Sequence, residues 1–343
     1  MKEKIKVLVC CLCIVLATAT ALGFAQALVI PKYMSKSLEG NLIAEYYNET
    51  TPHDVIFIGD CEVYECFTPP TLWEEYGITS YIRGSAQQLA WHSYYLLEET
   101  LKRETPKVVV FNVLALKYGE PQNEAYNRMT LDGMRWSASK INAIKASMTE
   151  DESFLSYVFP LLRYHSRWSE LEVEDWRYLF ARDTVSHNGY LMQTETVPMA
   201  QTGFTPFPLT DYTLPASSME YLERMRVLCE DSGVEFVLIK APTNSWRYYW
   251  YEEWDAQIVR YAEQNGLDYY NFISQDAEIG IDWSMDTYDG GAHLNVYGAE
   301  KMTSYFGKIL SEVYGVENRK NDAELSAVWQ EKVSAYYTEK GKE

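Results

Sequence analysis

The chain has 343 residues, of which 47% are hydrophobic and 23% are charged, so it is long and apolar enough to bury a sizeable core. Its 49 acidic and 30 basic residues give a formal net charge of −19, which argues against a nucleic-acid-binding protein with its basic surface. The 28 tyrosines, 10 tryptophans and 12 phenylalanines weakly indicate an aromatic cleft for a flat-faced ligand such as a sugar.

The N-terminal segment predicts a membrane helix. Residues 7–30 carry no charged side chain, and a bilayer-spanning helix needs about 20 apolar residues. Lys2, Lys4 and Lys6 precede the run, so this flank should stay cytoplasmic and the rest of the chain should be exported. A cleaved signal peptide is the alternative, with Ala25-Gln26-Ala27 as its cleavage site, but the run is long for a signal sequence. We therefore expect a single-pass anchor in the cell membrane, with the bulk of the chain extracytoplasmic.

The remaining chain predicts one α/β domain with a parallel sheet, because short apolar runs alternate with helical segments. The predicted strands are 54–59, 78–82, 107–113, 234–240 and 268–272. The predicted helices are 38–47, 69–76, 85–103 with Ser85 as its cap, 217–231, 252–265 and 296–314. The expected divisions are an anchor at 1–30, a connector at 31–53, the domain at 54–315 with a helical insertion at about 114–210, and a charged tail at 316–343.

Three places on this scaffold carry candidate chemistry. Gly59-Asp60-Cys61 follows the first strand directly, where a nucleophile would be exposed beyond the carboxyl end of the sheet. Gly84 and Asn112 end the next two strands, and their N–H groups are candidate oxyanion donors. A Gly-rich loop before the last helix holds Asp286, Asp289 and His293, and a His oriented by an Asp is the usual base beside a Ser or Cys nucleophile.

In order and position these residues resemble the SGNH/GDSL hydrolase family. That family begins its core with a Gly-Asp-Ser turn, uses a Gly and an Asn as oxyanion donors, and ends with Asp-x-x-His before the final helix. The resemblance implies a three-layer α/β/α fold of flavodoxin-like type, with Cys61 as nucleophile and His293 as base. Cys61 stands where the family has Ser. Asp289 lies four residues before His293 instead of three, so both Asp286 and Asp289 remain candidates to orient the imidazole.

The anchor, the long insertion and Lys240-Ala-Pro242 also resemble a narrower branch. It comprises the extracytoplasmic D-alanyl transfer proteins of teichoic-acid modification and the alginate-type O-acetylation proteins. This resemblance implies an acyl-ester hydrolase or O-acyltransferase that acts on cell-wall or exported polysaccharide. A membrane-bound O-acyltransferase is its implied partner. The alternatives are a catalytically inactive SGNH-like partner protein and, more remotely, a secreted lipase-like enzyme.

Several further residues allow two interpretations each. Arg163, His165 and Arg167 could bind an anionic glycan, although pairing with Glu170, Glu172 and Glu174 is favoured. Lys240 could be a buried ion-pair partner or a substrate contact. The aromatic patch could be a sugar platform, a membrane contact or, by default, helix packing; it comprises Trp246, Tyr248, Tyr249, Trp250, Tyr251 and Trp254.

The cysteines and their neighbours set the last expectations. Cys61, Cys66 and Cys229 lie outside the apolar segment and do not form a disulfide scaffold, although one bond between two of them stays open. No Cys/His spacing resembles a zinc site, so no metal or cofactor is expected. Glu62 and Glu65 place negative charge near Cys61 and should raise the pKa of its thiol.

Overall fold

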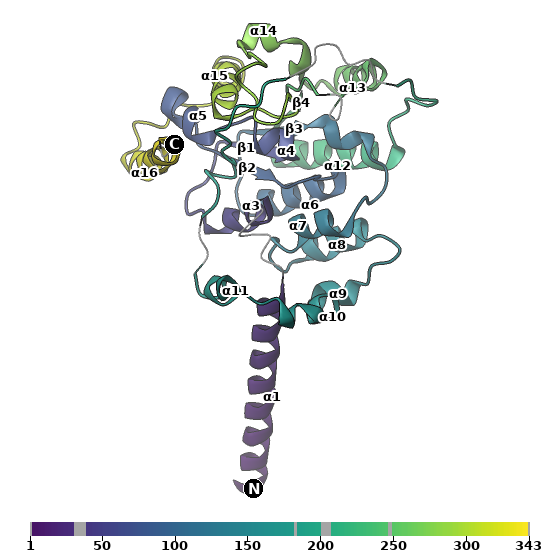
Figure 1. Cartoon of the computed structure of the whole chain (residues 1–343), viewed down its shortest axis with the longest axis vertical. Helices are drawn as coiled ribbons and strands as arrows, with labels where there is room; N and C mark the ends of the chain where they lie inside the picture. Colours follow the sequence, from purple (N-terminus) through teal and green to yellow (C-terminus); the bar gives the residue numbers. More distant parts are fainter. Residues whose placement is uncertain (1, 31–38, 182–183, 200–206, 246–248, 342–343) are drawn as a thin grey trace.

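A computed structural model describes residues 2–30, 39–181, 184–199, 207–245 and 249–341 of the chain. Helix α1 (Lys2–Val29) projects as a stem from the α/β domain that the rest of the described chain forms (Figure 1). Of the described helices, α1 alone is long and apolar enough to cross a membrane. Its length and composition suit a membrane anchor and a signal sequence alike.

The domain is built on a sheet of five parallel strands in the order β2-β1-β3-β4-β5, which confirms the predicted α/β fold with a parallel sheet. The strands are β1 (Val55–Gly59), β2 (Ser80–Gly84), β3 (Val108–Asn112), β4 (Glu235–Lys240) and β5 (Tyr269–Asn271). Strands β1 and β3 are buried along their whole length. Their near-continuous Val, Ile and Phe sequences are typical of strands covered on both faces.

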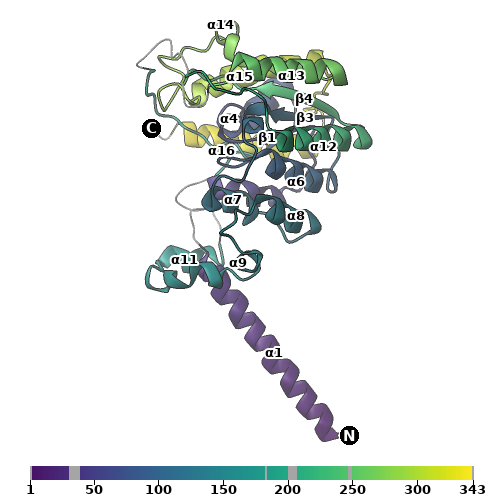
Figure 2. The same ribbon diagram turned by 90° about the vertical axis from the view of Figure 1, so that its right-hand side faces the viewer.

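Helices cover both faces of the sheet and make three layers (Figures 1 and 2). Alternate residues of β1 point to opposite faces, so Phe57 joins one hydrophobic core and Ile58 the other. On the Phe57 face lie α5 (Pro69–Tyr76), α15 (Val296–Glu312) and α16 (Ala323–Lys340). On the Ile58 face lie α6 (Ala90–Leu101), α12 (Ala216–Ser232) and α13 (Glu252–Asn265).

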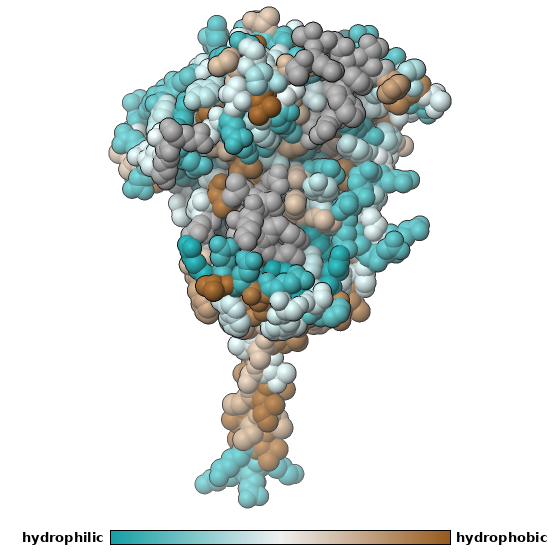
Figure 3. All heavy atoms as spheres, in the orientation of Figure 1, coloured by the Kyte–Doolittle hydropathy of each residue, from teal (hydrophilic) through white to brown (hydrophobic). Residues whose placement is uncertain are grey.

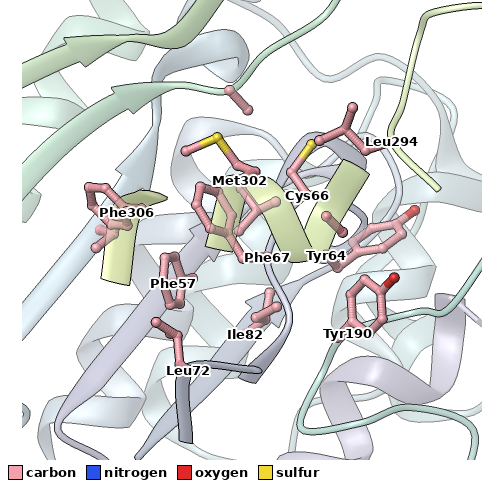
Figure 4. Close-up of a cluster of buried hydrophobic side chains, with 14 of the residues drawn as sticks. Phe57, Tyr64, Cys66, Phe67, Leu72, Ile82, Tyr190, Leu294, Met302 and Phe306 are labelled. Atoms are coloured by element: carbon pink, nitrogen blue, oxygen red, sulfur yellow. The ribbon is translucent and has the colours of Figure 1, made fainter. Parts of the chain in front are cut away.

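Figure 4 shows the core on the Phe57 face, where aromatic rings from three elements meet. The rings of Phe57 and Phe67 stack with centroids 4.7 Å apart, and Phe306 of α15 lies 5.7 Å from Phe67. Leu72 and Met302 close this cluster, and all five side chains are buried. The packing fixes α15 against β1, and the loop that precedes α15 is thereby brought to the sheet.

The predicted bounds of α6 and of β2 differ clearly from the structure. Helix α6 begins at Ala90 and not near Ser85, because Gln87 has a φ of 48°, in the left-handed region that a helix cannot contain. Ser85 does not cap α6 and instead hydrogen-bonds Gln88 Oε1 at 3.0 Å. Strand β2 spans Ser80–Gly84, so it begins and ends two residues later in the chain than the predicted 78–82.

The insertion is mainly helical up to Tyr178, whereas its described residues 184–199 form turns and an isolated β-bridge between His187 and Tyr190. It contains α7 (Glu124–Leu131), α8 (Ala138–Ser147), α9 (Phe154–Val158), α10 (Leu161–Tyr164) and α11 (Val173–Tyr178), with 3-10 turns η2 (Val113–Lys117) and η3 (His165–Ser169). Helix α8 packs on α6 through a third hydrophobic core that includes Leu96 and Ile144. Helices α9 and α11 lie at the upper end of α1 in both views (Figures 1 and 2).

Both flanks of the domain also fold. In the connector, α3 (Glu39–Glu45) and η1 (Tyr46–Asn48) occupy most of the predicted helix, whose first residue lies outside the described residues. The segment predicted as a charged tail forms α16, where buried Trp329 stacks on Trp73 of α5 with centroids 5.4 Å apart. The remaining short helices are α4 (Cys61–Tyr64), η5 (Phe272–Ser274) and α14 (Asp276–Ile279).

Candidate active site

The predicted nucleophile lies at the carboxyl end of a central strand. Cys61 follows β1 after one intervening residue and is the first residue of α4, with 9% of its surface exposed. Asp60 has extended backbone and caps the turn, because its Oδ1 accepts a hydrogen bond from the Glu62 N–H at 3.2 Å. This is the edge of a parallel sheet at which ligands bind in open α/β folds.

The predicted base, His293, lies on the loop before α15. Asn295 caps that helix by accepting hydrogen bonds from the N–H groups of Tyr297 and Gly298, each at 3.2 Å. The Asn295 N–H donates to the carbonyl of Asp286 at 3.0 Å, which closes the loop on itself. His293 therefore lies on a loop whose base is fixed to a core helix, and only 5% of its surface is exposed.

The structure places the Cys61 thiol and the His293 imidazole close enough for each to act on the pKa of the other. Asp289 engages the other side of the imidazole, with its Oδ2 2.7 Å from His293 Nδ1. Its Oδ1 accepts the backbone N–H of His293 at 2.9 Å, so ring and backbone are oriented by one carboxylate. Because Nδ1 is committed to Asp289, Nε2 is the nitrogen available to the thiol. Carboxylate, imidazole and thiol thus follow one another at the sheet edge.

Asp286, the other candidate, has different partners. Its Oδ2 lies 2.6 Å from Lys301 Nζ and accepts the Asp282 N–H at 2.7 Å. These contacts tie the loop to α15 and leave the orientation of His293 to Asp289.

Two further side chains contact the imidazole. Tyr288 stacks on the ring with centroids 6.0 Å apart and donates its hydroxyl to Glu65 Oε1 at 2.9 Å. Glu65 Oε2 lies 3.5 Å from His293 Nδ1. Burial lowers the pKa of His293, but the charges of Cys61 and Glu65 and the hydrogen bond with Asp289 outweigh it. The pKa of His293 is consequently well above its usual value.

The pKa of the Cys61 thiol is raised as well. Burial raises the pKa of Cys61, the His293 charge lowers it, and Asp60 and Glu65 raise it again, to about 11. The upward shift predicted from the acidic neighbours is present, but desolvation is its largest cause. Cys61 is therefore a neutral thiol at physiological pH.

A buried polar network lies beside Cys61. Lys240 Nζ lies 2.7 Å from Glu62 Oε2 and donates to the Ala241 carbonyl at 2.8 Å. Asn112 Nδ2 donates to Asp60 Oδ1 at 3.2 Å and to Glu62 Oε2 at 3.0 Å. The sequence allows Lys240 to be either a buried ion-pair partner or a substrate contact, and its contact with Glu62 is that of a buried ion pair. The Asn112 amide must give up its hydrogen bond to one carboxylate before it can donate a hydrogen bond to an oxyanion.

Gly84 lies where β2 meets α4. A Cβ at this position would lie 3.0 Å from Tyr64 Cδ1 and 3.2 Å from the Gly59 carbonyl oxygen. The close approach of α4 therefore requires glycine here, whatever its N–H contributes to chemistry.

Lys117 and Tyr118 are residues of this edge that sequence reasoning missed. They follow β3 within a few residues, and the charges of Asp60 and Glu62 act on both. Burial lowers the pKa of Lys117, and burial together with these carboxylates raises the pKa of Tyr118 to about 12. Their place just beyond a strand that ends in Asn112 was the signal that could have found them.

The basic cluster of the insertion lies elsewhere. Helix α10 and η3, which carry Arg163, His165 and Arg167, lie beside α1 and away from α4 (Figure 1). Arg163 pairs with Glu124 at 3.0 Å, and Arg167 bonds the Val29 carbonyl at 2.9 Å and Asp175 at 3.3 Å. These partners differ from the predicted Glu170, Glu172 and Glu174. His165 is exposed.

The aromatic patch packs around the start of α13. Trp250 is buried and donates its indole N–H to Asp255 Oδ1 at 3.2 Å, and Tyr251 contacts Trp254 edge-on at 4.6 Å. Two members of the patch, Trp246 and Tyr248, lie outside the described residues. Cys66 and Cys229 are buried free thiols, and Cys61 forms no disulfide with another described cysteine.

Comparison with known proteins identifies no family to which the chain is similar. No protein-family model matches the chain, and no curated protein matches it either. Within the described ranges, no group of three or more His, Cys, Asp and Glu side chains is arranged to hold a metal ion. The parallel sheet with its flanking helices is compatible with an SGNH-like fold.

Proposed function

We propose that the protein is an extracytoplasmic acyl-ester hydrolase or O-acyltransferase that uses Cys61 as its nucleophile. The observation that carries the proposal is the meeting of three groups at the carboxyl edge of the sheet: Asp289 Oδ2 lies 2.7 Å from His293 Nδ1, and the charge of His293 acts on the pKa of the Cys61 thiol. A thiol, an imidazole and an orienting carboxylate are the groups that nucleophilic acyl transfer requires.

In the first half-reaction the Cys61 sulfur attacks the carbonyl carbon of an acyl ester, and His293 accepts the thiol proton. The carbon–sulfur bond forms, the ester carbon–oxygen bond breaks, and the imidazolium returns the proton to the departing alcohol. In the second half-reaction a hydroxyl of the acceptor, or water, attacks the thioester. His293 takes the hydroxyl proton and delivers it to the departing thiolate, which restores the thiol.

The protonation states of Cys61 and His293 indicate that acylation is faster at alkaline pH. The pKa of Cys61, raised to about 11, leaves it a thiol near neutrality, and the upward direction of the His293 pKa favours the protonated imidazole. His293 must lose its proton before it can act as a base, so the rate of acylation should rise with pH.

The acceptor and the location follow from the resemblance and from α1. We propose cell-wall or exported polysaccharide as the acceptor, with a membrane-bound O-acyltransferase as partner. We also propose that α1 stays attached as an anchor. Leu28 and Val29 are buried and Arg167 binds the Val29 carbonyl, so cleavage after Ala27 would leave its new N-terminus inside the fold.

Labelling with a thioester-forming acyl probe tests the proposal. The wild-type chain should acquire the acyl group on Cys61, and Cys61→Ala and His293→Ala should each abolish labelling while the thermal unfolding midpoint stays close to that of the wild type. Cys229→Ala is the matched control, because Cys229 is also a buried free thiol. Labelling that survives in either site variant rejects the mechanism.

A non-catalytic partner protein is the second candidate. Two observations favour it: the Cys61 thiol has a pKa of about 11, and the Asn112 amide is bonded to two carboxylates. This candidate predicts no His293-dependent acylation of Cys61 at any pH at which the protein stays folded. It predicts instead that the chain co-purifies with a membrane acyltransferase whether or not Cys61 is present.

A further inference from the structure

Large hydrophobic side chains gather, exposed, on the part of the insertion that surrounds the end of α1. We call them the collar; its members are Leu155, Phe159, Leu162, Trp168, Val173, Trp176 and Phe180. Val173 is 84% exposed and Phe180 is 81% exposed, values that a folded domain rarely allows for a cluster of such residues. Figure 3 shows brown, hydrophobic atoms at the foot of the domain where the stem begins.

The collar is joined to α1 by direct contacts. The ring centroid of Phe24 lies 6.0 Å from that of Trp176 and 6.4 Å from that of Phe180. Arg167 Nη1 donates to the Val29 carbonyl at 2.9 Å and so satisfies a backbone group at the end of α1. The insertion is thereby held at a fixed level along the stem.

For an α1 that spans a bilayer, this level is expected near the bilayer surface. At about 1.5 Å per residue, the stretch from Val7 to Phe24 spans about 26 Å, close to the roughly 30 Å of a hydrocarbon core. Phe24 therefore lies near the outer boundary of the hydrocarbon, and the rings that pack on it lie at the depth of the headgroups. Trp and other amphipathic rings are enriched at this depth in membrane proteins.

The charges of the collar segment indicate which surface it suits. The segment from Phe154 to Phe180 contains three basic and four acidic residues: Arg163, Arg167 and Arg177, and Glu170, Glu172, Glu174 and Asp175. Two of the arginines are neutralised, Arg163 by Glu124 and Arg167 by Asp175. With a net charge of −19 on the whole chain, electrostatic attraction to anionic lipid is absent and apolar burial is the available driving force.

We infer that the collar is a second membrane contact, which seats the domain on the outer surface of a lipid bilayer around α1. The occupant is the lipid interface, because the collar is continuous with the membrane helix and places its rings at interfacial depth. The inference rests on α1 remaining attached as an anchor. It is independent of the chemistry proposed for Cys61.

Lipid-depth measurements on the full chain test this inference. Cys10, Cys11 and Cys13 are changed to Ala, one new cysteine is introduced and coupled to a fluorophore, and the protein is reconstituted in phosphatidylcholine vesicles with nitroxide-labelled lipid. Phe180→Cys and Phe207→Cys are a matched pair, since the two phenylalanines are 81% and 82% exposed. Phe207 lies beside the start of α13, at the end of the molecule opposite α1, because its carbonyl accepts the Tyr251 hydroxyl (Figure 1).

The label at Phe180→Cys should be quenched at least about twofold more strongly than the label at Phe207→Cys, and Val173→Cys should behave like Phe180→Cys. Added phosphatidylglycerol should not increase the quenching. Equal quenching at positions 180 and 207 in folded protein of full mass overturns the inference. It is also overturned if the collar is shielded only in cell membranes, which indicates a protein partner, or only with anionic lipid.

A charge variant gives an independent readout. Phe180→Glu in the Leu162→Cys background should reduce lipid quenching of the label, because a carboxylate is disfavoured at interfacial depth. Its circular dichroism spectrum should match that of the parent, because 81% of the Phe180 surface is exposed and the side chain is not part of a buried core. Unchanged quenching contradicts the inference even when the acylation of Cys61 is intact.

Discussion

Lys240 Nζ lies 2.7 Å from Glu62 Oε2, and neither side chain has exposed surface. The pair joins the end of β4 to the short helix α4 that begins with Cys61. It also receives the Asn112 amide, so three elements of the sheet edge depend on it. Paired charges of this kind are costly to separate, because the group left behind stays buried without its counter-charge.

Lys240→Met should therefore lower the free energy of unfolding by about 3–5 kcal/mol, as Glu62 loses its cation. Urea unfolding in detergent measures the effect. The double variant Lys240→Met with Glu62→Gln should recover much of the loss. Lys102→Met is the control, because the Lys102 side chain is 59% exposed and its pair with Glu98 should contribute less than about 1 kcal/mol.

Alkylation of Cys61 should depend steeply on pH. With a thiol pKa of about 11, the rate with iodoacetamide should rise about tenfold per pH unit between pH 7 and pH 10. Glu65→Gln should increase the rate at each pH, because it removes a negative charge that raises the pKa of Cys61. Mass spectrometry identifies the modified residue, and Glu331→Gln on the surface of α16 should leave the rate unchanged.

Asp289→Asn should separate orientation of the base from stability of its loop. Loss of the carboxylate that binds His293 Nδ1 should lower the pKa of the imidazole and reduce acyl transfer about 10²–10⁴-fold. Asp286→Asn removes the ion pair with Lys301 and should lower stability while the pKa of His293 stays unchanged. NMR titration of the imidazole distinguishes the two variants, and identical titration curves would contradict the assignment.

His92 should make the fold sensitive to acid. Burial lowers the pKa of His92 to about 3, whereas an unfolded His titrates near 6.5. Because the pKa of His92 is depressed in the folded state, neutral His92 contributes fully to the free energy of unfolding above pH 6.5. That contribution is lost as the pH falls, by about 2 kcal/mol between pH 7 and pH 5. His92→Gln should remove that part of the pH dependence. Equal pH slopes of the unfolding free energy in variant and wild type would reject this role.

The amino-acid sequence alone predicted the parallel sheet and the candidate groups at its edge. Strands such as Val55–Gly59 and Val108–Asn112 are apolar on both faces, and only a parallel sheet covered by helices satisfies that pattern. Because parallel strands end at one edge, the positions of Cys61 and Asn112 followed from the strands alone. The absence of charge over residues 7–30 likewise predicted the stem.

The partners of these groups depend on the three-dimensional packing of the chain. The loop before α15 reverses through Gly290 and Gly291, whose φ values are 81° and 98°, and this turn brings Asp289 back to the ring and the N–H of His293. Spacing along the chain could not distinguish Asp289 from Asp286, since neither lies at a distance fixed by regular helix or strand geometry. Likewise, Lys240 meets Glu62 and Arg167 meets Val29 through long-range packing, which local periodicity does not encode.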